Sequence, residues 1–249
     1  MPKIFLSPST QEYNPYIDGG NEEYYMNLIA DEMQPYLTAS GIEYVRNDPA
    51  KTVNASVAQS NAGLFNLHLA IHSNASAPSA AGKNRGVQIY FYPRSEQSRR
   101  AADIFAENYK RIYPLPELVK TIGTVKLAEV ARTTAPAILI EVAYHDNRAD
   151  AQWIRDNIGN IAKNLSESTA EFLGVKFRSP GVTRTGVVTT ESGSLNLRGQ
   201  PSTDSAILAR IPKGTAIPIA GQAGEWYLTE YSGMRGYVSS EFVTIRDMS

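Results

Sequence analysis

Three side chains have types that suit hydrolytic chemistry: His72, Glu141 and Glu23. The strand-like run "FNLHLAIH" (65–72) ends abruptly at His72, and small polar residues follow it at once. Parallel sheets place ligand-binding groups just beyond the carboxyl ends of their strands. His72 is therefore a candidate site residue, although a lone histidine at a strand end is also a common structural residue.

Glu141 lies in the middle of the apolar run "AILIEVAY" (137–144). An ionised carboxylate is costly to bury there and is seldom fully buried unless it is paired. It belongs either to an ion pair or to a site, and we favour a site because perturbed carboxylates cluster at functional sites. Glu23 falls in the first turn of a helix that Asn21 can cap, where the macrodipole favours negative charge. A solvated capping acid is the alternative for Glu23.

These residue types can together form a hydrolytic zinc site. Zinc that is held by neutral imidazole and carboxylate, with one open position, lowers the pKa of bound water to about 7 and polarises a carbonyl. A second carboxylate can then take and return the proton. The chain has no cysteine, which excludes disulfides, Cys-ligated zinc and thiol nucleophiles. His68, deeper in the same run, is expected to be a packed and hydrogen-bonded residue.

Composition limits the possible partners. With 249 residues and 42% hydrophobic content, the chain can build a core without metal or disulfide support. Its 24 Lys and Arg against 25 Asp and Glu give a net charge of −1, and no basic block predicts nucleic-acid binding. No stretch reaches the length of a membrane span, and the first apolar run is too short for a signal peptide.

The elements that must position these side chains alternate between strand and helix patterns. Helical spacing is present after Asn21, within 95–113 and from about 150 to 172, and the expected strands are "KIFL" (3–6), "IEYV" (42–45), "FNLHLAIH" (65–72), "GVQIYFY" (86–92) and "AILIEVAY" (137–144). This alternation predicts an α/β fold with a largely parallel, mixed sheet that is flanked by helices on both faces.

A second, smaller domain follows. Gly, Pro and polar residues dominate "GVKFRSPGVTRTG" (174–186), as in a linker. The remaining chain has short alternating runs broken by turn residues, a pattern typical of a small all-β barrel. We expect the first domain over 1–176, a linker over 177–183 and the all-β domain over 184–249.

The first domain resembles a known enzyme family. "YVRND", Asn61-Ala62, "LAIHSNA" and "PAILIEVAYHDN" resemble motifs of the zinc-dependent N-acetylmuramoyl-L-alanine amidases of the amidase-3 type, over about residues 3 to 173. The resemblance implies that His72 and Glu23 ligate zinc and that Glu141 is the catalytic acid and base. It also implies that Asn74 contacts the substrate.

One motif departs from the family. Where the family has an Asp-Pro-Gly-His stretch that supplies a zinc-ligating histidine, this chain has "SPSTQ", with Thr10 at the histidine position. Three outcomes remain open: Gln11 or a nearby group supplies an oxygen, His145 substitutes, or metal binds weakly or not at all. We favour Gln11 near the metal. A shift of one residue in the helix start would exchange the roles of Glu22 and Glu23.

The second domain resembles bacterial SH3-like domains over about residues 184 to 245. "LNLR" (195–198), "QPS" (200–202), "KGT" (213–215), Trp226 and "GYV" (236–238) correspond to that family's pattern. We assign Trp226 and Tyr237 to ligand binding, with a role in the barrel core as the alternative.

The resemblances imply a bacterial or phage peptidoglycan hydrolase. It would cleave the amide between N-acetylmuramic acid and the L-alanine of the stem peptide, while the SH3-like domain binds the cell wall. The alternatives are a hydrolase of another stem or cross-bridge bond, an inactive wall-binding protein on an amidase fold, and glutamates with only structural roles. Without a signal peptide, we expect release by lysis or a holin-type pore, as for endolysins, or a trimmed leader. The oligomeric state is left open.

Overall fold

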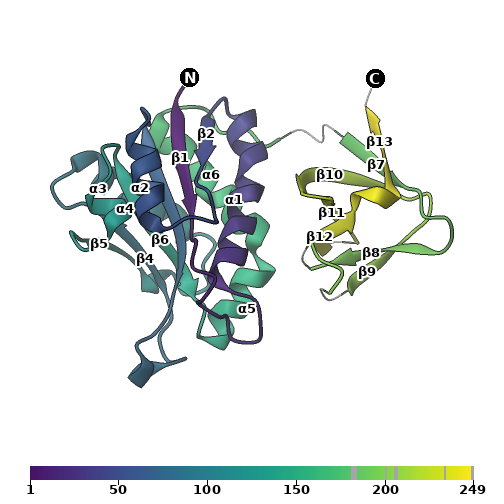
Figure 1. Ribbon diagram of the computed structural model, residues 1–249, viewed down its shortest axis with the longest axis horizontal. Helices are drawn as coiled ribbons and strands as arrows, with labels where there is room; N and C mark the ends of the chain where they lie inside the picture. Colours follow the sequence, from purple (N-terminus) through teal and green to yellow (C-terminus); the bar gives the residue numbers. More distant parts are fainter. Residues whose placement is uncertain (181–183, 200, 205–206, 233, 248–249) are drawn as a thin grey trace. The chain divides into compact units, whose positions relative to one another are not determined.

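The structure, a computed structural model, describes residues 1–180, 184–199, 201–204, 207–232 and 234–247. The chain divides into two compact units, Met1–Arg178 and Ser179–Ser249 (Figure 1). The boundary falls within the expected linker, of which residues 181–183 lie outside the described residues. In the part of the chain that the structure describes, no helix is both long and apolar enough to cross a membrane.

The first unit is built on a six-stranded mixed sheet in the order β2-β1-β3-β6-β4-β5. Strands β1, β2, β3 and β6 run parallel, and β4 pairs antiparallel with β6 and parallel with β5. The strands are β1 (Lys3–Pro8), β2 (Glu43–Arg46), β3 (Leu67–Asn74), β4 (Val87–Phe91), β5 (Val119–Gly123) and β6 (Ala137–Tyr144). Strands β3 and β6 are buried along almost their whole length, as expected for central strands that are covered on both faces.

Helices cover both faces of this sheet. Helices α1 (Glu22–Ala39) and α3 (Glu96–Tyr109) both pack against α6 (Ile158–Leu173), while α2 (Val53–Asn61) contacts the short α4 (Ala128–Ala131). Figure 1 shows α1 and α6 on one side of β1, and α2 and α4 on the other. The predicted α/β class, with a largely parallel sheet between helices, is confirmed.

The predicted helix over 150–172 is two helices, α5 (Arg148–Asp156) and α6. Asn157 separates them: its backbone leaves the helical region at φ −122°, and its side-chain amide donates to the carbonyl of Trp153. Asparagine competes for backbone hydrogen bonds in this way, which makes it a poor interior helix residue. No element was predicted at β5, α2 or α4.

The second unit is an antiparallel sheet in the order β13-β7-β10-β11-β12-β8-β9. Its strands are β7 (Arg184–Val188), β8 (Ser194–Arg198), β9 (Ile207–Pro212), β10 (Ala216–Ala223), β11 (Trp226–Tyr231), β12 (Met234–Ser239) and β13 (Val243–Asp247). Inward-facing aliphatic side chains form its own core, among them Leu197, Ile211 and Val238, which are fully buried. The expected small all-β module is confirmed.

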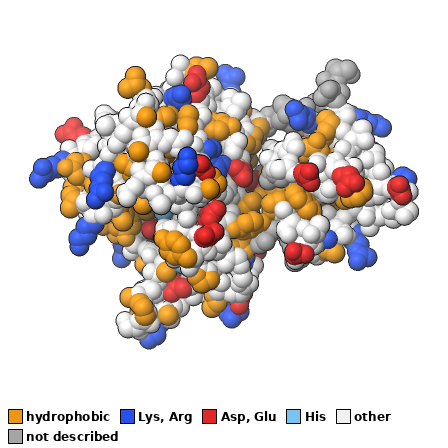
Figure 2. Space-filling model, viewed as in Figure 1, with side chains coloured by type: hydrophobic (Ala, Val, Ile, Leu, Met, Phe, Trp, Pro, Cys, Tyr) orange, Lys and Arg blue, Asp and Glu red, His pale blue; other side chains and the backbone are white. Residues whose placement is uncertain are grey.

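Charged side chains of both signs are interspersed on the face of the molecule drawn in Figure 2. This distribution agrees with the net charge of −1. On this face the two signs of charge are mixed, and neither forms a single-sign field of the kind that steers a polyanion.

Candidate active site

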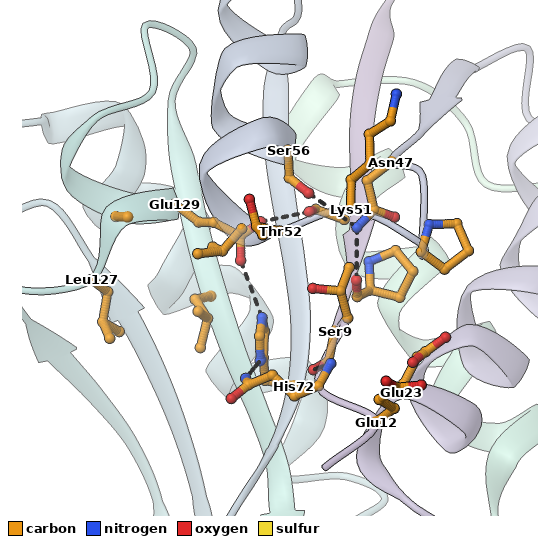
Figure 3. A pocket seen from close by; sticks show the side chains of 18 of the residues that line it. Ser9, Glu12, Glu23, Asn47, Lys51, Thr52, Ser56, His72, Leu127 and Glu129 are labelled. Carbon is orange, nitrogen blue, oxygen red and sulfur yellow. Dashed lines mark hydrogen bonds and ion pairs between the residues drawn. The ribbon is translucent and has the colours of Figure 1, made fainter. Parts of the chain in front are cut away.

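A cavity of about 750 Å³ opens at the carboxyl ends of β1, β3 and β6. Residues after β1, the loop between β2 and α2, and the region around α4 complete its wall, which includes Gln11, Lys51, His72, Glu129 and Glu141 (Figure 3). In open α/β sheets this is the edge at which ligands bind. The predicted site residues Gln11, Glu23, His72 and Glu141 all line this cavity.

His72 is the centre of a buried cluster of charged groups. It is 8% exposed near the end of β3, directly opposite Glu141 in the register with β6. Its Nδ1 lies 2.9 Å from Oε1 of Glu22, and its Nε2 lies 3.1 Å from Oε2 of Glu129. Burial lowers the pKa of His72, but the hydrogen bonds and charges of the two carboxylates outweigh it and raise this pKa well above its ordinary value.

The turn before α1 determines which glutamate meets His72. Gly19 and Gly20 adopt φ values of 103° and 79°, a left-handed conformation that glycine tolerates because it has no Cβ. Asn21 then accepts a hydrogen bond from the backbone N–H of Tyr24 at 2.8 Å, which confirms the predicted N-cap. The helix therefore begins at Glu22, which is 1% exposed and faces inward.

The predicted ligand was Glu23, but the structure brings Glu22 rather than Glu23 into contact with His72. Glu23 lines the cavity farther from His72, beside Glu12 (Figure 3). Partial burial, with the charge of Glu12, raises the pKa of Glu23. Burial alone would also raise the pKa of Glu22, but its contacts with His72 and Asn14 leave that pKa below its ordinary value.

One oxygen of the Glu141 carboxyl group has no hydrogen-bond partner among the described residues. Glu141 lines the cavity, and although the residue as a whole is partly exposed, this oxygen, Oε2, is buried. Burial raises its pKa to about 7; the positive charge of His72 opposes this rise and the negative charge of Glu22 adds to it. Such a group can accept and release a proton near neutral pH.

Gln11 lies beside His72, as expected, and Thr10 lines the same cavity. The Nε2 of Gln11 is 3.2 Å from Nδ1 of His72, and its Oε1 accepts from Asn14 at 3.2 Å. Asn14 uses the same amide group to donate to Oε2 of Glu22 at 2.6 Å. Asn14, which sequence reasoning did not select, thus orients both Gln11 and Glu22.

Glu129 is the main site residue that sequence reasoning missed. It is 3% exposed in α4 and contacts both His72 and His68. A signal was present, because "LAEVA" (127–131) repeats the pattern of "LIEVA" (139–143), a glutamate inside a short apolar run. The argument that selected Glu141 applies equally to Glu129.

The other two histidines lie outside the cavity. His68 is fully buried, with Ser60 at 2.9 Å and Glu129 at 3.2 Å, which confirms the packed and hydrogen-bonded role predicted for it. His145 is 3% exposed and its Nδ1 contacts Ser73. Because His145 is fixed by Ser73 and stacked on Tyr16, it does not substitute for an imidazole at position 10.

Asn74, the substrate contact predicted in the first unit, does not line the cavity. The amide of Asn74 donates to Oε1 of Gln88 at 2.9 Å. In the second unit Trp226 is half-buried, whereas Tyr237 is 4% exposed. Tyr237 therefore packs as a core residue and has little surface left for a ligand, which corrects its assignment to ligand binding.

The donor set can be compared with what a divalent cation requires. Among the described residues, no group of three His, Cys, Asp or Glu side chains is arranged to hold a metal ion. Glu22 and His72 supply two strong donors 2.9 Å apart, a separation compatible with one ion bound at ~2.0–2.2 Å by each. A rotation of the Gln11 amide would present its oxygen as a third donor. The residues thus fit a cation with two strong ligands and one weak one.

Comparisons with known proteins agree with this architecture. The family model for N-acetylmuramoyl-L-alanine amidase (amidase-3) matches residues 10–171, and the model for the bacterial SH3 domain matches residues 193–244. A Bacillus subtilis (strain 168) protein named as an N-acetylmuramoyl-L-alanine amidase, YrvJ, is 24% identical over 106 residues, which are 42% of this chain. The matched part spans only 18% of that longer protein.

Solved structures share the fold of the first unit. The amidase AmiC2 of Nostoc punctiforme has a TM-score of 0.60 at 16% identity, over 70% of this chain and 97% of that one. The catalytic domain of CwlV from Bacillus (Paenibacillus) polymyxa gives 0.60 at 20% identity, over 71% and 100%. The catalytic domain of the CD27L endolysin, which targets Clostridia difficile, gives 0.56 at 18%, over 69% and 98%.

The sheet, the buried carboxylate–histidine cluster at its carboxyl edge and the match of the family model over most of the first unit lead to one conclusion. This chain belongs to the N-acetylmuramoyl-L-alanine amidase family.

Proposed function

We propose that the chain hydrolyses the amide bond between N-acetylmuramic acid and the L-alanine of the peptidoglycan stem peptide. The observation that carries this proposal is Glu141, a buried carboxyl group with an unpartnered oxygen and a pKa of about 7 on the wall of the cavity. Family membership supports the choice of bond. The cavity of about 750 Å³ is large enough for the sugar and peptide on either side of it.

In this proposal Glu141 moves the proton. Its ionised carboxylate takes a proton from the attacking water, whose oxygen forms a bond to the amide carbon. The protonated Glu141 then gives that proton to the departing nitrogen as the C–N bond breaks, which leaves a carboxylic acid on the lactyl group and a free amine on alanine. His72 stands directly opposite Glu141, and its position limits where the substrate carbonyl can lie.

The metal in this proposal is zinc, which Glu22, His72 and the amide oxygen of Gln11 would hold. Bound zinc would lower the pKa of water and polarise the substrate carbonyl. Asn14 holds the Glu22 carboxylate in place through its 2.6 Å hydrogen bond. Because an amide oxygen is a weaker zinc ligand than an imidazole, we expect weaker zinc binding than at a site with two histidines.

The second unit, in the proposal, attaches the enzyme to the cell wall. Its match to a bacterial SH3 domain supports this role, and tethering raises the local concentration of the catalytic unit on a polymeric substrate. The half-buried Trp226 has the amphipathic ring that suits a ligand surface. Peptidoglycan is then the partner of both units.

The test is to incubate purified peptidoglycan with the wild type, with Glu141→Gln and with Glu117→Gln as an exposed control. Labelling of new amino groups identifies the residue that carries each. We expect new N-terminal alanine from the wild type and the control only.

Other outcomes would overturn the proposal in distinguishable ways. New termini on a different residue would indicate another stem or cross-bridge bond. If the protein binds peptidoglycan but no new terminus forms, the chain is a wall-binding protein on an amidase fold. The presence of Thr10 at the usual histidine position is the reason to consider this alternative. Unchanged cleavage by Glu141→Gln would remove Glu141 from the mechanism.

A further inference from the structure

Glu129 contacts three side chains from two strands of the first unit, β1 and β3. Its Oε1 is bonded to the hydroxyl of Ser7 in β1 and lies 3.2 Å from Nε2 of His68. Its Oε2 lies 3.1 Å from Nε2 of His72. A carboxylate has about four acceptor sites, so most of its capacity is used, and rotation would break contacts on both oxygens.

His68 is itself held in place. Its Nδ1 lies 2.9 Å from the hydroxyl of Ser60 in α2, and its ring stacks on Phe5 with centroids 5.2 Å apart. The contacts therefore run without a gap from Ser60 through His68 and Glu129 to His72. Every member except His72, at 8% exposed, is 3% exposed or less.

The two nitrogens of His72 have different surroundings. Among the described residues, Glu129 is the only side chain within hydrogen-bond distance of Nε2, whereas Nδ1 faces Glu22 at 2.9 Å and Gln11 at 3.2 Å. An imidazole that ligates a metal through one nitrogen commonly donates its other N–H to a carboxylate, which fixes the ring and raises its basicity as a ligand. Glu129 occupies that outer place.

We infer that Glu129 is a positioning residue, which holds the His72 ring through Nε2 so that Nδ1 points at the cation site formed with Glu22 and Gln11. This inference rests on the proposed function, because it assigns a role toward the metal of that same site. Glu129 touches neither substrate nor the reacting atoms in this role; it acts through His72.

A purely structural role for Glu129 makes a different prediction. If Glu129 only neutralised buried histidines, its loss would lower the free energy of unfolding and leave the metal affinity of the folded protein unchanged. If it orients His72, the metal affinity itself should fall. Ser7→Ala is the matched control, since it removes a hydrogen bond to the same carboxylate without touching either nitrogen of His72.

The experiment measures zinc affinity of the full chain by competition with a chromophoric chelator, together with urea unfolding of the metal-free protein. Glu129→Gln should weaken zinc binding by about 10- to 100-fold, the range for outer carboxylate partners of ligating histidines. Ser7→Ala should lower the free energy of unfolding but keep the zinc affinity within about threefold of wild type, because the bond it removes is not to His72. If Glu129→Gln does not fold, Glu129→Asp takes its place, with at least about tenfold weaker binding expected because the shorter side chain cannot span both histidines.

Zinc affinity of Glu129→Gln within twofold of the wild type would overturn the inference, and so would a wild-type protein that binds no zinc. The peptidoglycan assay on the same samples judges the proposed function separately. If the wild type cleaves peptidoglycan but Glu129→Gln binds zinc as tightly as the wild type, the positioning role of Glu129 is rejected and the proposed amidase activity is retained. If the wild type binds zinc but does not cleave peptidoglycan, the proposed amidase activity is rejected.

Discussion

Replacement of Glu141 by glutamine should stabilise the fold above neutral pH while it removes the proposed base. Burial raises the pKa of this carboxyl from 4.5 to about 7. One pKa unit corresponds to about 1.4 kcal/mol, so ionising Glu141 in the folded, metal-free protein costs ~3 kcal/mol at pH 8. Because the residue is partly exposed, water reduces this figure, and we expect a gain of ~2–3 kcal/mol.

The contribution of Glu141 to the free energy of unfolding depends on pH, and its sign follows from the two pKa values. Between pH 4.5 and about 7 the folded protein holds a proton on Glu141 that the unfolded chain has released, so this group lowers stability as pH rises through that window. Below pH 4.5 both states are protonated and the cost vanishes; above about 7 it is present in full. Glu141→Gln should therefore be about as stable as the wild type at pH 4, apart from the effect of the amide itself, and more stable at pH 8.

The assay is urea unfolding of metal-free protein at pH 4 and pH 8, followed by tryptophan fluorescence. The chain has two tryptophans, Trp153 and Trp226, one in each unit. A Trp226→Phe background makes Trp153 in α5 the single reporter and isolates the first unit. Chelation of metal is essential, because a bound cation would lower the pKa of Glu141 and offset the cost. A stability difference that is the same at pH 4 and pH 8 would refute the reasoning.

Three further predictions concern activity and metal binding. The kcat/KM of the wild type should fall about tenfold per pH unit on the acid side of a midpoint at or below about 7, because Glu141 must be ionised to accept the proton; a flat profile down to pH 5 would contradict its role as the base. Glu22→Gln should lower kcat/KM by about 10- to 100-fold and Glu23→Gln by less than about threefold, since only Glu22 contacts His72; equal losses in the two variants would reject the corrected assignment. Thr10→His should strengthen zinc binding by at least about tenfold in chelator competition, because imidazole is a better zinc ligand than the amide it would assist; unchanged affinity would place the cation elsewhere.

The parts of the fold that follow from periodicity were predictable. The buried runs that became β3 and β6 are long, apolar and rich in β-branched residues, and Asn21 followed by two glutamates is a strong helix start. The short α4 and the edge strand β5 were not predicted. Helix α4 has only four residues and no side-chain cap, so its conformation depends on packing against β6 and α2 rather than on a local signal.

The site was predictable where a charged residue interrupts an apolar run. This reasoning selected Glu141, and the abrupt end of an apolar run selected His72; the strand register places the two side by side. Neither signal separated Glu22 from Glu23, because both fall in the first turn of α1 and the inward direction is decided by the exact turn at Gly19 and Gly20. The role of Asn14 could not be predicted either. It depends on the path of the loop that brings Asn14 next to Glu22, eight residues farther along the chain.

The charges of the cluster would favour the proposed cation even though this chain has Thr10 where the family it resembles has a histidine. Glu22 and Glu129 both contact His72, and Glu141 lies opposite it; once Glu141 ionises, three carboxylates face one imidazole. Buried charges are costly unless they are compensated, and a divalent cation between Glu22 and His72 would supply that compensation. Because imidazole is a neutral ligand, its replacement by Thr10 weakens coordination without removing any of the negative charge. If a cation binds here as proposed, the negative charge that attracts it is intact, while the preference for zinc over oxygen-seeking ions is reduced. Thr10→His should then raise the preference for zinc and leave the electrostatic attraction unchanged.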